Sequence, residues 1–390
     1  MKTDKDEIIV KDPNIIGSSS IPAERTPIGI PDDYKPSIAL LPNGEILLIG
    51  YHQYFHTTPY SYSSIFDNVA MKKDTEREIL LYRSQDRGIN WSERNIMQIP
   101  GGKEPFLSIT KKGTIFITHR IMSRDVDNLD EYTSFLISRS EDNGYSWETR
   151  RIGRKEMASP NATYIGQSRN IVETPYGSLL IAFSDKQLHS YIWESFDEGK
   201  TWGKKERFSL RDDKEGLFAF WYGFFTDSYL WYSKPDRLLI LARTESAHYP
   251  IEGRTAPKKQ DCNHRFILFE SIDHGRTAKR VKDFTDYGEM FPSILRLKNG
   301  HLLLTFTVRA LKRPLGVQAV LGKETEDGGF LFDFEHDRII IDAKTPDNQS
   351  NGGGYGNTIE LEDSSLVTSY SYRGADGRTY MEVVRWKLDL

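Results

Sequence analysis

The chain has 390 residues, of which 28% are charged, and its formal net charge is −4 at neutral pH. It contains no long basic stretch and no run of about 18 apolar residues, which argues against a nucleic-acid partner and against a membrane-spanning helix. A single cysteine, Cys262, excludes an internal disulfide and a cysteine metal site. The first seven residues have no apolar core. We therefore expect no secretion signal and a cytoplasmic protein, or an extracellular or periplasmic one if a leader was removed.

Six segments along the chain each combine a strand, a short turn and a second strand. In chain order they are Pro36–Ile49, Pro105–Thr118, Asn170–Phe183, Ser228–Ala242, Met290–Phe306 and Gly356–Tyr370. The repeat is about 55 to 70 residues long, enough for a four-stranded antiparallel sheet with one long loop. A closed ring of such sheets leaves only short, protected strand edges.

The motif Ser-x-Asp-x-Gly recurs at one place in this repeat, after an apolar third strand. Four copies begin at Ser84, Ser140, Ser195 and Ser271, and a weaker fifth begins at Thr325. Asp can bond the backbone amides of a tight turn, Gly accepts positive φ, and the Trp that ends three copies can bury its ring. We interpret these turns as structural.

Together these patterns predict an all-β protein, a six-bladed β-propeller formed by a single domain over residues 1–390. The last unit lacks its own fourth strand because the chain ends just after Trp386. The N-terminal run Glu7–Val10 is the expected donor, which would close the ring by pairing the two ends of the chain.

In such a ring, the residue before each innermost strand lies at one mouth of the central channel. These positions are Lys35, Glu104, Arg169, Asp227, Glu289 and Tyr355. All six are ionisable or phenolic, which favours a functional pocket over a purely structural channel mouth.

The loops between second and third strands open at the same mouth. They contribute aromatic residues and His52 in the first unit, and Arg243, Arg309 and Arg313 in later units. Arginines and carboxylates in this number suit an anionic or polyhydroxylated ligand. His52 and His56 do not have the spacing of a zinc site, so we expect no metal and no cofactor.

The turns, and the C-terminal blocks Leu303–Arg309, Arg313–Ala319 and Gly353–Leu361, resemble those of the sialidase superfamily, whose propellers carry Asp-box (BNR) turns. The resemblance covers nearly the whole chain. It implies that Tyr355 is the nucleophile, with Asp227 or Glu289 as its base. It further implies that the acid/base is Asp67 or Asp74, and that Arg243 and Arg313 (or Arg309) bind the carboxylate of the substrate.

The chain departs from that pattern at the superfamily's first arginine. Its position holds Tyr34, followed by Lys35 and Pro36. An ammonium group cannot make the planar two-point contact of a guanidinium with a carboxylate. Losing one such pair costs roughly 1.5–3 kcal/mol of binding, so the departure weakens the case for sialic acid as substrate.

These observations predict a glycoside hydrolase acting on a terminal sugar, either an exo-α-sialidase or a related glycosidase. Tyrosine nucleophiles are a recognised exception among glycosidases, and Glu104 with Glu289 is the alternative two-carboxylate pair. Two further hypotheses stay open. One is a carbohydrate-binding propeller without catalysis, and the other is a polysaccharide lyase on the same scaffold. In each case the expected partner is a glycan or small saccharide. The oligomeric state does not follow from the sequence.

Overall fold

The computed structural model describes residues 7–53, 77–123, 125, 128–129, 132–153, 165–185, 190–208, 226–234, 237–243, 250–251, 254–255, 264–309, 314–348 and 353–390. Within these ranges the chain forms strands and no helix, so the all-β prediction is confirmed. No helix in the described part is long and apolar enough to cross a membrane.

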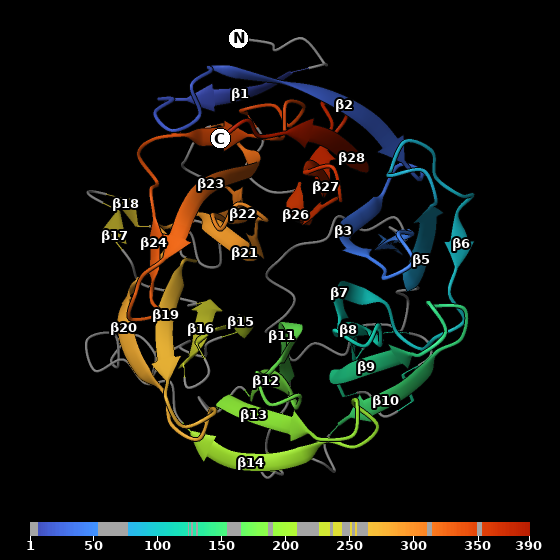
Figure 1. Ribbon diagram of the computed structural model, residues 1–390. Helices are drawn as coiled ribbons and strands as arrows, with labels where there is room; N and C mark the ends of the chain where they lie inside the picture. The colour runs from blue at the N-terminus through green and yellow to red at the C-terminus, as the bar shows by residue number, and fades with distance from the viewer. Residues whose placement is uncertain are drawn as a thin grey trace.

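Four sheets have four antiparallel strands each, and they stand around a common centre with their first strands innermost (Figure 1). The first sheet consists of β3 (Asp33–Leu40), β4 (Ile46–Gln53), β5 (Arg77–Ser84) and β6 (Asn95–Ile96). The second consists of β7 (Lys103–Ile109), β8 (Ile115–Ile121), β9 (Ser134–Ser140) and β10 (Glu148–Ile152). The third sheet consists of β11 (Ile165–Glu173), β12 (Leu179–Asp185), β13 (Ser190–Ser195) and β14 (Gly203–Phe208). The fourth consists of β15 (Thr226–Lys234), β16 (Arg237–Arg243), β19 (Phe266–Ser271) and β20 (Lys279–Asp283). The pair β17 (Pro250–Ile251) and β18 (Arg254–Thr255) is separate.

The rest of the ring is one ten-stranded sheet that contains both ends of the chain. One part consists of β21 (Glu289–Arg296), β22 (Leu302–Val308), β23 (Gly316–Glu324), β24 (Phe330–Phe332) and β25 (Arg338–Ile340). The other consists of β26 (Gly354–Glu360), β27 (Ser365–Arg373), β28 (Thr379–Lys387) and β2 (Ser20–Ile28), and β1 (Glu7–Lys11) joins the two parts.

The closing strand differs from the prediction by one element. The partner of β28 is β2, whereas β1, which contains Glu7–Val10, pairs with β2 and β25. Strand β2 buries Ile21 and Ala23 in one core cluster and Ile28 in another. Its prolines and charged residues hide this pattern in the sequence, which is why β1 was expected in its place.

The hydrophobic core consists of apolar layers between neighbouring sheets rather than one central cluster. Leu48 packs with Val367 and Val383 on one side of its sheet, and Leu47 packs with Leu107 and Ile117 on the other. Because both faces of a sheet are covered, its strands read as continuous apolar runs such as Ile46–Ile49.

The Ser-x-Asp-x-Gly turns join third and fourth strands in the way that the sequence predicts. In the first copy the Ser84 hydroxyl donates to Asp86 Oδ1 (2.9 Å) and accepts from the Gly88 amide (2.8 Å). The Asn90 amide also donates to Asp86 Oδ1, at 2.8 Å. The serine hydroxyls at Ser140, Ser195 and Ser271 accept from the corresponding glycine amides at 2.8–2.9 Å.

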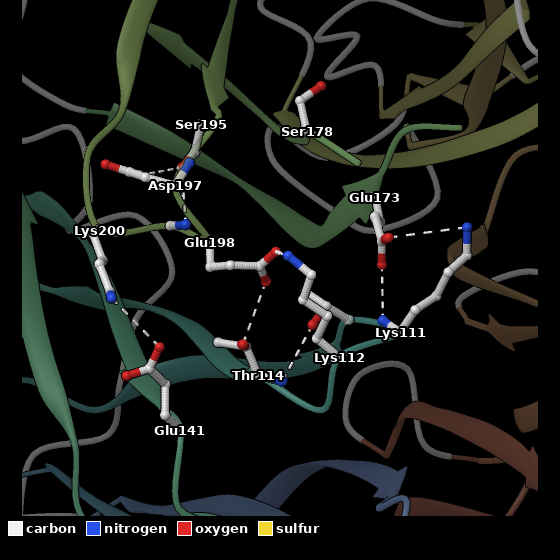
Figure 2. A network of polar contacts seen from close by, with 12 residues as sticks. Lys111, Lys112, Thr114, Glu141, Glu173, Ser178, Ser195, Asp197, Glu198 and Lys200 are labelled. Carbon is white, nitrogen blue, oxygen red and sulfur yellow. Dashed lines mark hydrogen bonds and ion pairs between the residues drawn. The ribbon is translucent and has the colours of Figure 1, made fainter. Parts of the chain in front are cut away.

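These turns also connect neighbouring sheets. Figure 2 shows the turn at Asp197 facing the β7–β8 turn, where Glu198 Oε1 lies 2.7 Å from Lys112 Nζ. Arg139 of β9 donates to the Glu198 carbonyl at 2.5 Å. The following residue, Gly199, packs directly on the Phe116 ring, so the turn locks one sheet against the next.

Replacing Gly199 by alanine should destabilise the protein more than the same change at Gly177. Both glycines have positive φ, at 78° and 85°. An added Cβ would lie 2.4 Å from Phe116 Cε1 at Gly199, whereas nothing lies within 4 Å at Gly177. The backbone strain costs about 1 kcal/mol at either site, and the clash adds about 1–3 kcal/mol at Gly199 alone. Urea unfolding of both variants measures the difference, and equal losses would contradict the packing argument.

Candidate functional site

A pocket lies among the inner strands of the ring, whose arrangement is seen in Figure 1. Its empty space, open solvent included, is about 300 Å³. The described residues that line it are Lys35, Pro36, Glu104, Pro105, Phe106, Arg169, Asp227, Phe291 and Tyr355. They come from β3, β7, β11, β15, β21 and β26, so every inner strand contributes to one small volume.

A backbone irregularity aims most of these side chains into the pocket. The pairing of each inner strand with its neighbour shifts near the strand's start, as at a β-bulge. Five lining residues lie within these shifts and have positive φ: Lys35 (51°), Glu104 (55°), Asp227 (48°), Phe291 (56°) and Tyr355 (52°). Such a conformation is uncommon for residues other than glycine and occurs preferentially at functional sites.

The charged groups form a chain of alternating sign across the pocket. Lys35 and Arg120 both pair with Glu104, and Arg120 Nη2 also lies 3.6 Å from Asp227 Oδ1. Arg243, the last residue of β16, completes the chain at 2.7 Å from Asp227 Oδ2. Each carboxylate is therefore held between two cations.

Burial and pairing move two pKa values in this chain. Burial lowers the pKa of Lys35 to about 7, although Glu104 opposes the shift. Burial by itself would raise the pKa of Glu104, but Lys35 and Lys103 outweigh it and lower that pKa to about 2. At neutral pH, Glu104 is thus ionised and Lys35 is close to half protonated.

Changing Glu104 to glutamine should lower the pKa of Lys35 further, because it removes the negative charge that raises it. NMR titration of lysine-labelled protein measures this pKa, and Lys35→Met assigns the resonance. We expect a midpoint near pH 7 in the wild type and a lower one in the variant. Titration near the ordinary lysine value in both proteins would contradict the assignment.

Aromatic rings and a lysine fix the position of Tyr355. Its ring centroid is 3.8 Å from that of Phe291 and 5.7 Å, edge-on, from that of Tyr34. Lys35 Nζ lies 3.8 Å from the Tyr355 centroid, a cation–π contact. The Tyr355 amide donates to Thr307 Oγ1 at 2.9 Å, which holds the backbone at the bulge.

Arg309 also lies next to Tyr355, with its guanidinium carbon 5.1 Å from the ring centre. Its Nη2 donates to the Tyr34 hydroxyl (3.0 Å) and to the Gly353 carbonyl (2.8 Å). Tyr34 occupies the position that the sialidase pattern assigns to its first arginine. In this protein the tyrosine at that position instead accepts a hydrogen bond from Arg309.

Of the residues singled out in the sequence, Lys35, Glu104, Arg169, Asp227 and Tyr355 line the pocket, and Arg243 and Arg309 contact lining residues or Tyr34. His52 is not among the lining residues. Its Nδ1 lies 2.7 Å from Asp33 Oδ1, in a cluster that includes Tyr82. Asp67, Asp74, His56 and Arg313 lie outside the described residues.

Glu289 is the one predicted inner-strand position that does not reach the pocket. It is 2% exposed, and its Oε1 lies 2.7 Å from Arg338 Nη2. Phe291, two residues later, takes the corresponding place at the bulge. The sequence contains a signal for this register, because Phe291 precedes a proline as Lys35 and Glu104 do.

Arg120 links the two carboxylates, and it was not among the residues selected from the sequence. It lies near the end of β8, the second strand of its sheet. Arg243 and Arg309 have equivalent positions, because Arg243 ends β16 and Arg309 follows β22. A cation at the end of a second strand is the shared signal. Across the described ranges, no group of three or more His, Cys, Asp or Glu residues could hold a metal ion.

Comparison of the structure with solved proteins identifies the architecture. A protein of unknown function from Dyadobacter fermentans is 17% identical over 99% of both chains, with a TM-score of 0.65. An intramolecular trans-sialidase from Ruminococcus gnavus is 13% identical over 92% of this chain and 94% of its own, with a TM-score of 0.62. The fold is sialidase-like.

The fold is also similar to that of a solved enzyme whose name refers to arabinose rather than to sialic acid. An α-L-arabinofuranosidase from Fusarium graminearum is 13% identical over 98% of both chains, with a TM-score of 0.55. No family model and no curated protein matches the sequence. At these identities the likeness concerns the fold alone.

Proposed function

We propose that the protein is a glycoside hydrolase that removes a terminal sugar, built on a six-bladed β-propeller with Asp-box turns. One observation carries the proposal: Tyr355 and Asp227 line the same small pocket, each on an inner-strand bulge. The similar structures include a trans-sialidase and an α-L-arabinofuranosidase, which supports a saccharide as the substrate.

In the proposed reaction Tyr355 is the nucleophile and Asp227 is its base. As the phenolic oxygen bonds to the anomeric carbon, its proton passes to the Asp227 carboxylate, and the glycosidic bond breaks. The leaving oxygen takes a proton from an acid, for which Asp67 is the candidate from the sequence. Water then attacks the anomeric carbon and gives its proton to that acid's conjugate base. The departing Tyr355 oxygen recovers its proton from Asp227.

The surroundings of Tyr355 suit this role. The ordinary pKa of a tyrosine is about 10, so the phenol needs a base and a positive environment to react at neutral pH. Asp227 pairs with Arg243, and the Lys35 ammonium lies over the Tyr355 ring. Glu104 is a poor candidate for a general acid, because its lowered pKa leaves it without a proton at neutral pH.

A specific observation also favours a second candidate, a polysaccharide lyase. Lys35 has a pKa of about 7 and lies against Tyr355, so its neutral form can act as a base at physiological pH. A lyase would remove a proton next to the carboxylate of a uronic acid and expel the neighbouring sugar by elimination. Its product would contain a carbon–carbon double bond, which a hydrolase product lacks.

A panel of aryl glycosides and oligosaccharides tests both candidates. It should contain the α-sialoside, α-L-arabinofuranoside, β-glucuronide and neutral hexosides, together with uronate-containing oligosaccharides. Release of the aryl group without new ultraviolet absorption supports the hydrolase, and the sugar released defines its specificity. Unsaturated products would support the lyase instead. If no substrate turns over and saccharides still bind, the protein is a carbohydrate-binding propeller and the proposal is wrong.

A further inference from the structure

We propose that Arg169 is the anchor for an anionic substituent on the substrate, so that the preferred ligand is a sugar carrying a carboxylate or a sulfate. This inference rests on the proposed function, because it takes the pocket around Tyr355 to be a saccharide site. It concerns an arginine of β11, which is distinct from Arg243 and Arg313 (or Arg309), the arginines that the sialidase resemblance assigns to the carboxylate.

The starting observation is a buried cation without a polar partner. Arg169 lines the pocket and is 6% exposed, and its Nε is buried without a hydrogen bond. Within the described chain its guanidinium makes no ion pair and no hydrogen bond. By contrast, Arg120 and Arg243 pair with carboxylates, and Arg309 donates to Tyr34 and Gly353.

The carboxylates of the pocket do not reach Arg169. Glu104 and Asp227 influence it electrostatically, but each is already paired with two other cations. Burial lowers the pKa of Arg169, although Tyr355, Asp227 and Glu104 oppose the shift. A buried charge without a partner is costly, and titratable groups perturbed by burial cluster at functional sites.

Three aromatic rings surround the guanidinium of Arg169. Its guanidinium carbon lies 4.9 Å from the centre of Phe106, 5.4 Å from that of Phe291 and 5.5 Å from that of Tyr355. These apolar faces weaken competition from water for an incoming anion, and they offer surfaces on which a sugar ring can stack. The planar guanidinium fork matches a carboxylate or sulfate group.

The distances also indicate which sugar unit carries the anion. Arg169 and Tyr355 are close enough for one sugar ring to contact both. The anionic group is therefore on the terminal sugar whose anomeric carbon faces Tyr355, rather than on a distant unit of the glycan. The described cations around this pocket outnumber its two carboxylates, which is consistent with an anionic ligand.

Equilibrium binding of free monosaccharides tests the inference without requiring turnover. The probes are D-glucuronate, N-acetylneuraminate and galactose 6-sulfate, each compared with neutral glucose or galactose by calorimetry or ligand-observed NMR. We expect the wild type to bind at least one anionic sugar about 10- to 100-fold more tightly than the neutral ones. Comparison of the affinities for the uronate, the sialate and the sulfated sugar identifies the preferred anion.

Arg169→Met should remove this preference while leaving the weak affinity for neutral sugars within about twofold. Arg378→Met is the matched control, because it also removes one positive charge but from an exposed pair with Asp32. It should retain the wild-type preference. Equal binding of anionic and neutral sugars by the wild type, or an unchanged preference in Arg169→Met, would overturn the proposal.

Thermal unfolding of the same variants separates a binding role from a structural one. Arg169→Met removes an uncompensated buried charge, so it should be at least as stable as the wild type without ligand. A variant that is clearly less stable, or that does not fold, would show that Arg169 supports the fold and would also overturn the proposal. If anion-selective binding is found but the glycoside panel shows no turnover, the hydrolase proposal fails and this site stands.

Discussion

Replacing Tyr355 by phenylalanine should lower kcat on the substrate found with the panel on the order of 10³-fold or more, with little change in KM. The change removes only the phenolic oxygen. The ring contacts with Phe291, Tyr34 and Lys35 are available to phenylalanine, so the pocket should keep its shape. A loss confined to kcat is the signature of an interaction made only in the transition state.

Tyr34→Phe is the matched control for that experiment. It removes a hydroxyl from the same aromatic cluster, but this hydroxyl accepts a hydrogen bond from Arg309 and has no proposed covalent role. Its effect should be much smaller. A fluorinated glycosyl fluoride should also trap the covalent intermediate, and mass spectrometry should locate the label on Tyr355. Retention of a tenth or more of kcat in Tyr355→Phe, or a label on another residue, would exclude this nucleophile.

Glu382→Gln should destabilise the protein by about 3–5 kcal/mol, because it removes the negative charge from a buried ion-pair cluster. Glu382 is fully buried in β28 and pairs with Arg25 of β2 at 3.3 Å and with Lys344, which follows β25. The Tyr370 hydroxyl donates to the same carboxylate. This cluster holds both ends of the chain together, so a loss of this size is a large part of the stability of a typical domain.

Glu24→Gln is the matched control, since Glu24 also connects β2 to β28. Its carboxylate lies 3.0 Å from Arg385, but its side chain is 76% exposed. Exposed pairs contribute little, so the free energy of unfolding should change far less than for Glu382→Gln. Urea unfolding of both variants gives the comparison. Similar losses in the two variants would mean that burial does not determine how much the ion pairs of Glu382 contribute to the free energy of unfolding.

The inner hairpins and the Ser-x-Asp-x-Gly turns could be predicted because their signals are local. Strand pattern, turn glycines and the serine–aspartate pair lie within a few residues of one another. Strand β2 could not be recognised in this way. Pro22 and Pro27 and the charged residues between them interrupt its apolar pattern, and its pairing with β1 and β28 defines it as a strand.

Most of the candidate site could be predicted from the sequence, except where a bulge changes which residue faces the pocket. Lys35, Glu104, Asp227 and Tyr355 were found because the position just before an inner strand recurs in each repeat. Glu289 was selected in place of Phe291 because a bulge shifts the register by an amount that the sequence pattern does not fix.

The sequence alone therefore determined the all-β repeat, its structural turns and most of the side chains at the mouth of the ring, since each depends on neighbours in the chain. The tertiary structure decided which strand pairs with β28 and which charges neutralise one another. Arg120, Asp227 and Arg243 form one chain of ion pairs, whereas Arg169 is left among aromatic rings. The contact between Arg120 and Asp227 joins two sheets, and the energies of these pairings depend on distance and burial in space rather than on separation along the chain.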